Sequence, residues 1–336
     1  MTHRTILRSA LAFVVTLLLS ATAHAQLFRA YLAPSGNDMN ACTLPAPCRL
    51  LPAALAAVTD GGEIWMLDSA NYNTGPVNIT KSVTILAIPG ALGSVLATGG
   101  NAINIATAGV KVALRNLVIV PLPGGGGTGG ISMTAGAGLT VENCLIAGLP
   151  GTGIFVDAAA SVRVTNTTIR GNGIRGLDFR NGARATVTQA TISGNADGGV
   201  IVYGTIASTT TTADIADSTL DGNYVGIIAW SQHASAVLNV SIRDSRVVQN
   251  SPFGVIAQST YGASATLSVS NNIISNNGDG IRAVSAGSKV WASGNTISDN
   301  GTGLFNNTGL FESAGNNAVR NNNIDTLGTI TVIPTQ

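Results

Sequence analysis

The chain between Leu139 and Ile324 repeats one short pattern of apolar and polar positions eight times. In the clearest copy, from Val162 to Phe179, two alternating aliphatic residues lead to Asn or Asp, then to a small residue and another aliphatic one. Asn follows three residues later, and Gly with a second alternating aliphatic pair closes the unit. The alternation is typical of short β-strands, and the Asn and Gly positions are typical of bends. The second Asn recurs at spacings of 23, 28, 27, 27, 23 and 21 residues: Asn172, Asn195, Asn223, Asn250, Asn277, Asn300 and Asn321.

A near-constant period of this length predicts a stacked β-solenoid. One unit cannot bury its own apolar face, so successive coils have to stack and share a core. The composition agrees, because 4% aromatic residues, 10% charged residues and 41 glycines suit a narrow aliphatic interior with a bend in every coil. We therefore expect one all-β domain over residues 26–336, with about ten coils over residues 69–336.

Residues 26–68 are expected to form an N-terminal cap region. The Ala/Leu-rich segment from Leu50 to Val58, with Pro52 in its first turn, is the one good helix candidate. We expect Asp60-Gly61-Gly62 to end this helix and Glu63–Leu67 to form a strand. A helix here would cover the open end of the first coil, which otherwise invites edge-to-edge pairing.

Residues 1–25 have the features of a secretory signal peptide. Two basic residues precede the apolar run Ala10–Leu19, and Ala23-His24-Ala25 supplies a cleavage site before Gln26. We therefore expect a secreted or periplasmic protein, and no later apolar run is long enough to span a bilayer. Cleavage would remove two of the 17 basic residues and none of the 16 acidic ones, leaving a formal charge of −1. No basic run indicates a nucleic-acid partner.

The three cysteines fall into two groups. Cys42 and Cys48 lie close together in a Pro-rich loop, and we expect an exported protein to oxidise them to a local disulfide. Cys144 remains, either as a small inward-facing residue of the stack or as a reactive thiol. The repeat aligns Cys144 with small residues: Thr167, Ala190, Ser218 and Ser245.

Aligning the repeats predicts which side chains of successive coils are neighbours. The second and fourth positions after the coil glycine should point outward, because the first and third carry the core aliphatics. The first outward row contains Asp178, Ile201, Ile228, Ile256, Arg282 and Phe305. The second contains Arg180, Tyr203, Trp230, Gln258, Val284 and Asn307. Tyr203 and Trp230 are thus expected to be adjacent, beside an exposed isoleucine stripe.

The longest coils place their extra residues directly after this outward-facing strand, around residues 205–212, 231–236 and 259–264. Such loops could wall a shallow groove in which aromatic rings stack on sugars. Alternatively, the loops could fold over the stripe and bury it as a satellite core. The candidate ligand-binding residues of the groove are Tyr203, Trp230, Ile201, Ile228, Ile256 and Gln258.

Four N-terminal segments resemble those of secreted right-handed parallel β-helix proteins with the pectate-lyase-like fold. They are Y-L-A-P-S-G-N-D, P-C-R-L-L-P-A-A-L, G-G-E-I-W-M-L with A-N-Y, and V-N-I-T-K-S-V-T-I-L. The resemblance implies a right-handed parallel β-helix with a short N-terminal capping helix. It implies no single activity, because this fold hosts polysaccharide lyases, glycoside hydrolases, uronan epimerases, phage tailspikes and adhesins.

Carboxylate pairs suited to glycoside hydrolysis are scarce. Such enzymes need two carboxylates about 5 to 9.5 Å apart. Asp217 and Asp244 share one repeat position on successive coils, so they could form such a pair. The same position holds Asn or Gln in other coils, which favours a bend-capping role. The acidic motifs of the pectin-hydrolase and alginate-epimerase relatives are absent.

A lyase would need a basic residue and a means of neutralising a uronate carboxylate. Arg175, Asp178 and Arg180 are the candidate catalytic residues, although an Arg cluster is also typical of a solvated edge. Calcium enters only under this lyase hypothesis, and one carboxylate is too few for a convincing site. We predict no metal centre and no other cofactor, since His233 is the one histidine outside the signal peptide.

The sequence therefore supports two functional hypotheses. The first is an exported, non-catalytic module that binds a polysaccharide or cell-surface glycan through the Tyr203/Trp230 face. The second is a carbohydrate-active enzyme, in particular a uronate polysaccharide lyase. The missing acid pairs and histidines favour the first, and the family resemblance favours the second.

Overall fold

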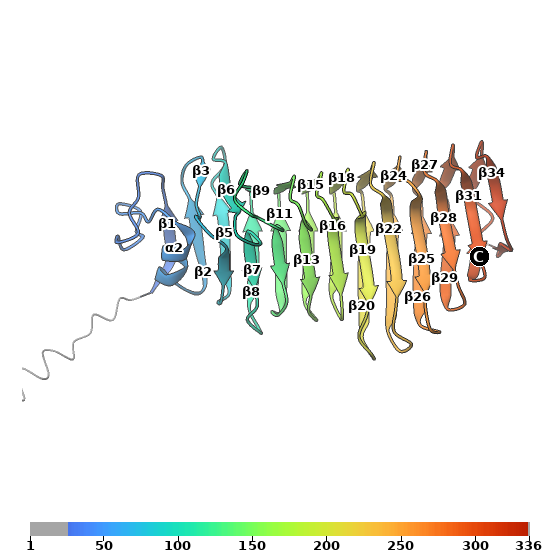
Figure 1. Cartoon of the computed structure of the whole chain (residues 1–336), viewed down its shortest axis with the longest axis horizontal. Helices are drawn as coiled ribbons and strands as arrows, with labels where there is room; N and C mark the ends of the chain where they lie inside the picture. Colours follow the sequence, from blue (N-terminus) through green and yellow to red (C-terminus); the bar gives the residue numbers. More distant parts are fainter. Residues whose placement is uncertain (1–25, 335–336) are drawn as a thin grey trace, which may run out of the picture.

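The computed structural model describes residues 26–334, and the expected signal peptide lies outside this range. The chain forms a rod of stacked coils, in which each coil contributes one strand to each of three parallel sheets (Figure 1). We name the sheets 1, 2 and 3 in their order along a coil. The parallel β-solenoid predicted from the sequence is confirmed, with about 11 coils where about ten were expected.

Sheet 1 has 13 strands. They are β1 Leu27–Leu32, β2 Val58–Met66, β5 Val83–Ala87, β8 Lys111–Arg115, β11 Gly138–Glu142, β14 Ser161–Thr165, β17 Arg184–Thr188, β20 Thr210–Ala216, β23 Val237–Arg243, β26 Ser264–Ser270, β29 Ser288–Ser293, β32 Leu310–Ser313 and β35 Thr331–Val332.

Sheets 2 and 3 have 11 strands each. Sheet 2 contains β3 Ala70–Asn71, β6 Gly93–Ala97, β9 Leu117–Pro121, β12 Leu145–Ala147, β15 Thr168–Arg170, β18 Thr191–Ser193, β21 Thr219–Asp221, β24 Arg246–Val248, β27 Ile273–Ser275, β30 Thr296–Ser298 and β33 Ala318–Arg320. Sheet 3 contains β4 Val77–Ile79, β7 Ile103–Ile105, β10 Ile131–Met133, β13 Ile154–Asp157, β16 Arg175–Arg180, β19 Gly198–Gly204, β22 Val225–Ser231, β25 Phe253–Ser259, β28 Asp279–Val284, β31 Thr302–Asn307 and β34 Ile324–Leu327.

The interior of the rod is filled by the alternating aliphatic positions of all three sheets. In one coil these are Val162 and Val164 of sheet 1, Ile169 of sheet 2, and Leu177 and Phe179 of sheet 3, all fully buried. Burying one such side chain contributes about 1.5–3 kcal/mol. Because every coil repeats this set, one continuous core runs along the rod.

In the regular coils, the bend between sheets 1 and 2 has two residues, and the first of them is in the left-handed region. Asn and Asp are favoured at this position because their short polar side chains tolerate positive φ better than bulky side chains do. Asp217 and Asp244, with φ of 50° and 52°, occupy this bend, and Asp244 pairs with Arg243 on the outside of the rod. Their position supports the bend-capping interpretation. The series runs Asn116, Asn143, Asn166, Gln189, Asp217, Asp244 and Asn271.

The bend between sheets 2 and 3 contains a ladder of buried asparagines. Asn250 is typical: its Oδ1 accepts bonds from the main-chain N and Nδ2 of Asn223, both at 3.0 Å. Its own N and Nδ2 donate to Oδ1 of Asn277, at 2.9 and 3.0 Å. The sequence assigned Asn321 to the end of this ladder, but Asn322 occupies the position, because the last coil is closer to the common period.

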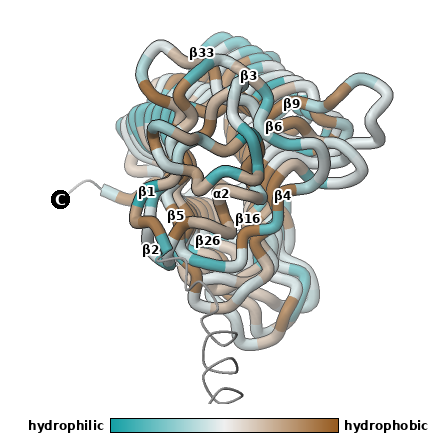
Figure 2. The backbone as a smooth tube through the Cα atoms, turned by 90° about the vertical axis from the view of Figure 1, so that its left-hand side faces the viewer, coloured by the Kyte–Doolittle hydropathy of each residue, from teal (hydrophilic) through white to brown (hydrophobic). Residues whose placement is uncertain are grey.

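Helix α2, Leu51–Ala57, lies across the N-terminal end of the tube (Figure 2). It buries Leu51, Ala54 and Leu55 against the first coil, as a capping helix should. The predicted break after the helix is wrong, because β2 begins directly at Val58 and includes Asp60-Gly61-Gly62. A register shift between β1 and β2 accommodates these residues as an irregularity within the strand.

The extra residues of the longest coils lengthen strands as well as loops. Strands β19, β22 and β25 of sheet 3 and β20, β23 and β26 of sheet 1 each have seven residues. The loops between them are short: residues 205–209, 232–236 and 260–263. These coils reach furthest along the lower edge of the rod in Figure 1. Among residues 26–334, no helix is long and apolar enough to cross a membrane.

The asparagine ladder yields a stability prediction. Asn250→Ala would leave the main-chain N–H of Asn223 and one of its Nδ2 hydrogens without a partner inside the protein, and the Leu220 carbonyl would lose a donor. The free energy of unfolding should therefore fall by about 2–4 kcal/mol. Urea unfolding followed by circular dichroism would measure it. Asn239→Ala, on the exposed outer side of β23, is the control and should change stability by less than about 0.5 kcal/mol. Equal effects of the two substitutions would contradict the role of the ladder.

Candidate ligand-binding face

The outer face of sheet 3 carries the candidate residues, and its strand register agrees with both predicted rows. Asp178 pairs with Ile201, Ile201 with Ile228, and Ile228 with Ile256. In the second row, Arg180 pairs with Tyr203, Tyr203 with Trp230, and Trp230 with Gln258. The repeat alignment therefore identified the neighbours on this face correctly.

The predicted exposure of the isoleucine stripe is wrong. Ile201, Ile228 and Ile256 are only 2%, 8% and 2% exposed and form a second apolar cluster outside the tube. Partly buried side chains of the same face cover them, namely Tyr203, Trp230, Phe253 and Val284. The stripe is therefore buried, as in the satellite-core alternative. Its cover consists of neighbouring side chains of the same sheet, however, and not of the short loops. These isoleucines support the face from beneath and are not available to touch a ligand.

Tyr203 and Trp230 form the exposed aromatic part of the face. Their ring centroids are 5.5 Å apart and the rings are tilted by 58°. Nε1 of Trp230 donates to Oγ1 of Thr260 at 3.1 Å, and the Tyr203 hydroxyl accepts from Nη2 of Arg175 at 3.2 Å. Both rings are half-buried, and the guanidinium carbons of Arg175 and Arg180 lie 4.8 and 5.1 Å from the centroid of the Tyr203 ring. Hydrogen bonds and packing hold the pair in a fixed orientation.

A buried carboxylate organises one end of this face. Asp178 is 1% exposed and accepts from Nη1 of Arg175 at 2.6 Å. It also accepts two bonds from Arg180, from Nε at 2.9 Å and from Nη2 at 2.8 Å. Nε of Arg175 donates to Asp197 at 2.7 Å. The structure therefore brings all three candidate catalytic residues together, and adds Asp197, which the sequence argument missed.

This arrangement determines what the two arginines can do. Burial lowers the pKa of Arg175, but the charge and hydrogen bonds of Asp178 outweigh it, so the pKa lies above its ordinary value. The hydrogen bonds from Arg180 to Asp178 raise the pKa of Arg180 as well. A guanidinium that already holds its proton so firmly is a poor proton acceptor at neutral pH. The geometry therefore does not support either arginine as the base of a lyase.

A second cluster, centred on the single arginine Arg282, lies at the other end of the face. Nη1 of Arg282 donates to Asp279 at 2.9 Å, and its guanidinium carbon lies 5.0 Å from the Phe253 ring and 4.5 Å from the Phe305 ring. Arg282 belongs to the first outward row predicted from the sequence, where no role was assigned to it. The spacing of Asp279 and Arg282 in the sequence could have indicated this ion pair, since an Asp and an Arg three residues apart form an ion pair in both clusters. The two clusters bracket the aromatic part of the face.

The remaining candidates lie elsewhere. Cys42 and Cys48 form a disulfide near the N-terminal cap. Cys144 is buried in the bend between sheets 1 and 2, where its main-chain N–H donates to Oγ1 of Thr167. Among residues 26–334, no three His, Cys, Asp or Glu side chains come together as a metal site.

The environment of Cys144 predicts low reactivity. Burial raises the pKa of its thiol to about 11, so little thiolate exists at pH 8. Native protein should therefore resist alkylation by iodoacetamide at pH 8, and protein unfolded in urea without reductant should gain one label per chain in mass spectrometry. Rapid labelling of Cys144 in the native state would contradict this prediction.

The Asp178 cluster yields a second prediction. Asp178→Asn would leave two largely buried guanidinium groups without their main countercharge, so the free energy of unfolding should fall by about 3–5 kcal/mol. Asp197→Asn is the matched control, because Asp197 also binds Arg175 but is 48% exposed. It should cost less than about 1 kcal/mol. Urea unfolding measures both, and a larger loss for Asp197→Asn would disprove the central role of Asp178.

Comparison with known proteins extends these observations. Residues 94–214 match the family model described as the right-handed beta helix region. No curated protein matches the sequence. The solved structures similar to this chain include the pectate lyase Pel9A, with 16% identity, a TM-score of 0.57, and coverage of 88% of this chain and 79% of that one.

Two other similar structures are carbohydrate-related. The A-module of the mannuronan C-5 epimerase AlgE4 of Azotobacter vinelandii has 12% identity and a TM-score of 0.54, with coverage of 82% of this chain and 89% of that one. XylC in complex with xylose has 10% identity and a TM-score of 0.52, with coverage of 83% and 69%. At these identities the similarity concerns the fold alone. The chain thus has the right-handed parallel β-helix fold, with the pectate-lyase-like architecture.

Proposed function

We propose that this protein is a non-catalytic module that binds polysaccharide through the outer face of sheet 3. The observation that carries the proposal is the pair of half-buried rings, Tyr203 and Trp230, in contact on adjacent coils. Aromatic rings stack on the apolar faces of sugars, and their fixed orientation lowers the entropy lost on binding. Gln258 follows Trp230 in the same row and offers an amide to sugar hydroxyls.

The isoleucine cluster supports this role indirectly. Ile201, Ile228 and Ile256 fill the space beneath the rings, so the rings cannot sink into the face when a ligand presses on them. The aromatic side chains are therefore presented on a rigid floor. A rigid, preformed surface of this kind is typical of small-molecule and sugar sites.

The charges of the face favour a neutral polysaccharide. Arg175 and Arg180 both bind Asp178, and Arg175 also binds Asp197. At the far end, Arg282 is paired with Asp279. Each guanidinium thus has a carboxylate partner, and a uronate would have to compete with it. Hydroxyl groups can instead bond to the free edges of these pairs.

The uronate lyase remains the alternative, supported by the fold that this chain shares with a pectate lyase. The paired state and raised pKa of Arg175 and Arg180 argue against it. Incubation with polygalacturonate separates the two hypotheses, because a lyase generates an unsaturated product that absorbs ultraviolet light. Export likewise remains a proposal, which rests on the signal-peptide features of residues 1–25.

The binding proposal predicts the effect of removing one ring. Trp230→Leu keeps an apolar side chain over the isoleucine cluster but removes the stacking surface, so affinity for a bound neutral polysaccharide should fall about fivefold to tenfold. Tyr203→Leu should have a similar effect. Affinity electrophoresis against xylan, glucan and mannan, followed by calorimetry on any hit, measures the change.

Trp291→Leu is the control, since this partly exposed tryptophan lies on the outer face of sheet 1. It should leave the affinity unchanged. The proposal fails if Trp230→Leu and Tyr203→Leu bind as tightly as the unmodified protein, or if no neutral polysaccharide binds.

A further inference from the structure

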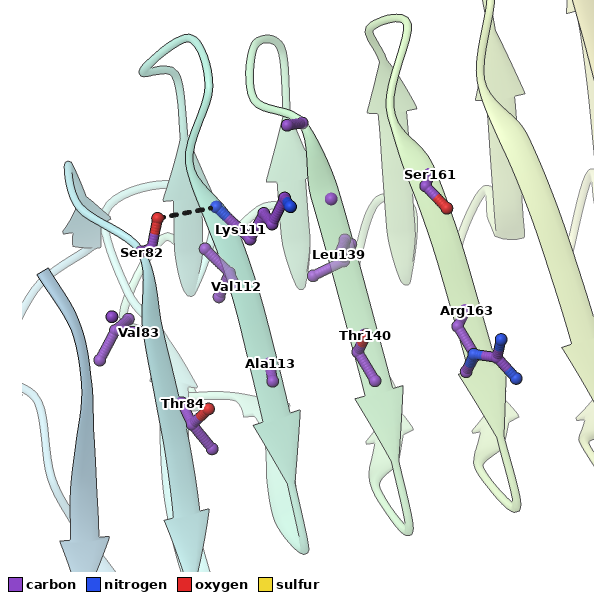
Figure 3. Close-up of a pocket in the computed structure, with 13 residues that line it drawn as sticks. Ser82, Val83, Thr84, Lys111, Val112, Ala113, Leu139, Thr140, Ser161 and Arg163 are labelled. Carbon is purple, nitrogen blue, oxygen red and sulfur yellow. Dashed lines mark hydrogen bonds between the residues drawn. The ribbon is translucent and has the colours of Figure 1, made fainter.

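A shallow groove with a volume of about 530 Å³ lies on the outer face of sheet 1, away from the Tyr203/Trp230 face (Figure 3). It crosses strands β5, β8, β11 and β14 near the N-terminal half of the rod. The strands that line it come from sheet 1, whereas Tyr203 and Trp230 belong to sheet 3. Nothing in the proposed function involves this groove.

The groove exists because two small residues replace larger ones in adjacent rows. In one row Ala113 lies between Thr84 and Thr140. In the next, Gly138 lies between Lys111 and Ser161. The Lys111 side chain extends from β8 toward β11, as Figure 3 shows, and its Cγ lies beside Gly138. The small side chains of Ala113 and Gly138 therefore leave a depression between their larger neighbours on the surface of sheet 1.

The charged residues that line this hollow are basic, and one carboxylate, Asp60, lies at its end, where it accepts a hydrogen bond from the main-chain N of Ser82 at 2.7 Å. Lys111 and Arg163 line it, and Arg184 follows Ser161 on the next strand. All three side chains are exposed, and among residues 26–334 none forms an ion pair with an acidic side chain. The nearest acidic residue along β11, Glu142, is already paired with Arg115 at 2.8 Å. The groove thus has an uncompensated positive charge, which contrasts with the paired arginines of sheet 3.

We infer that this groove binds a linear acidic polysaccharide along the axis of the rod. Its basic residues suit carboxylate or sulfate groups. The hydroxyls of Ser82, Thr84 and Ser161 suit a chain rich in hydroxyl groups. No aromatic side chain lines the groove, as a site for unstacked nucleobases would require, and no exposed large apolar side chain is there to enter a lipid surface.

The spacing of the basic residues fits a polymer. Adjacent strands lie about 4.8 Å apart, so Lys111 and Arg163 are two strand spacings apart and Arg184 is one further. This spacing is close to the length of one pyranose unit in an extended polysaccharide. An acidic unit at Lys111 would therefore be followed by one at Arg163 two units later and by one at Arg184 three units later, with Arg163 two residues along its strand from the row that Lys111 and Arg184 share.

The test is binding of the purified chain to polygalacturonate, which carries carboxylates, and to dextran sulfate, which carries sulfates, with neutral dextran as reference. The triple variant Lys111→Ser, Arg163→Ser and Arg184→Ser should weaken binding of the recognised polyanion at least about tenfold at low salt. One molar NaCl should abolish binding by the unmodified protein, because screening is strong at that concentration. The polymer that binds identifies the acidic group.

A matched control removes three basic residues from other parts of the surface: Arg170→Ser, Arg246→Ser and Lys289→Ser. This triple variant has the same net charge and should retain most of the binding. Equal loss in both triple variants would mean diffuse attraction by net charge, and would overturn the inference. Absence of binding to either polyanion would overturn it too.

A second pair of variants acts on the shape of the groove. A Cβ atom at Gly138 would lie 3.6 Å from Cγ of Lys111, an ordinary contact, so a side chain is tolerated there. Gly138→Glu should abolish polyanion binding by filling and neutralising the groove, and Gly138→Gln should weaken it less. Trp230→Leu should leave polyanion binding unchanged, so failure of the groove and failure of the proposed sugar-stacking face are distinguishable.

Discussion

The structure depends on satisfying buried polar groups at each bend in the same way from coil to coil. In the bend between sheets 2 and 3, each asparagine accepts two bonds from the asparagine before it and donates two to the one after it. The Nδ2 groups of the ladder also donate to buried main-chain carbonyls, such as those of Ile192 and Leu220, so the ladder satisfies main-chain and side-chain groups together. At the C-terminal end Asn322 donates instead to Asp325, whose pKa is lowered by these hydrogen bonds. The ladder therefore ends on a charged acceptor at the surface.

A ladder of this kind fixes the register of all three sheets. Each bend must lie directly over the one below, so the strands between bends align residue by residue. From β16 to β29, the changes in coil length fall mainly in the connection between sheets 3 and 1, where strands β19, β20, β22 and β23 have seven residues each. Outward-facing rows consequently become continuous surfaces, and their chemistry can vary without disturbing the core.

The sequence predicted the parts of the fold that follow from this repetition. The neighbours Tyr203 and Trp230 were found because alternation and bend position alone determine register. It left open whether the isoleucine stripe is exposed or buried, because burial depends on how the side chains of one face pack together. Ile201, for example, extends over Gly198, which has no side chain to keep it away. The direct passage from α2 into β2 was missed because the two glycines do not pair with β1. They lie in the irregularity between the pairs Leu27–Val58 and Arg29–Glu63, and Gly62 pairs with Val83 of β5.

The outer face of sheet 3 and the groove on sheet 1 differ more in the pairing of their charged side chains than in their shapes. On sheet 3 the carboxylate of Asp178 is paired with two arginines, so a ligand gains little from electrostatic attraction. Binding there must rely on contacts with the aromatic rings and on hydrogen bonds to hydroxyl groups. On sheet 1 Lys111 and Arg163 have no such partner, so attraction acts over a distance and is weakened by salt. A polymer with neutral and acidic stretches could contact both faces of one rod at once. Its overall affinity would then exceed that of either face, because the second contact becomes intramolecular.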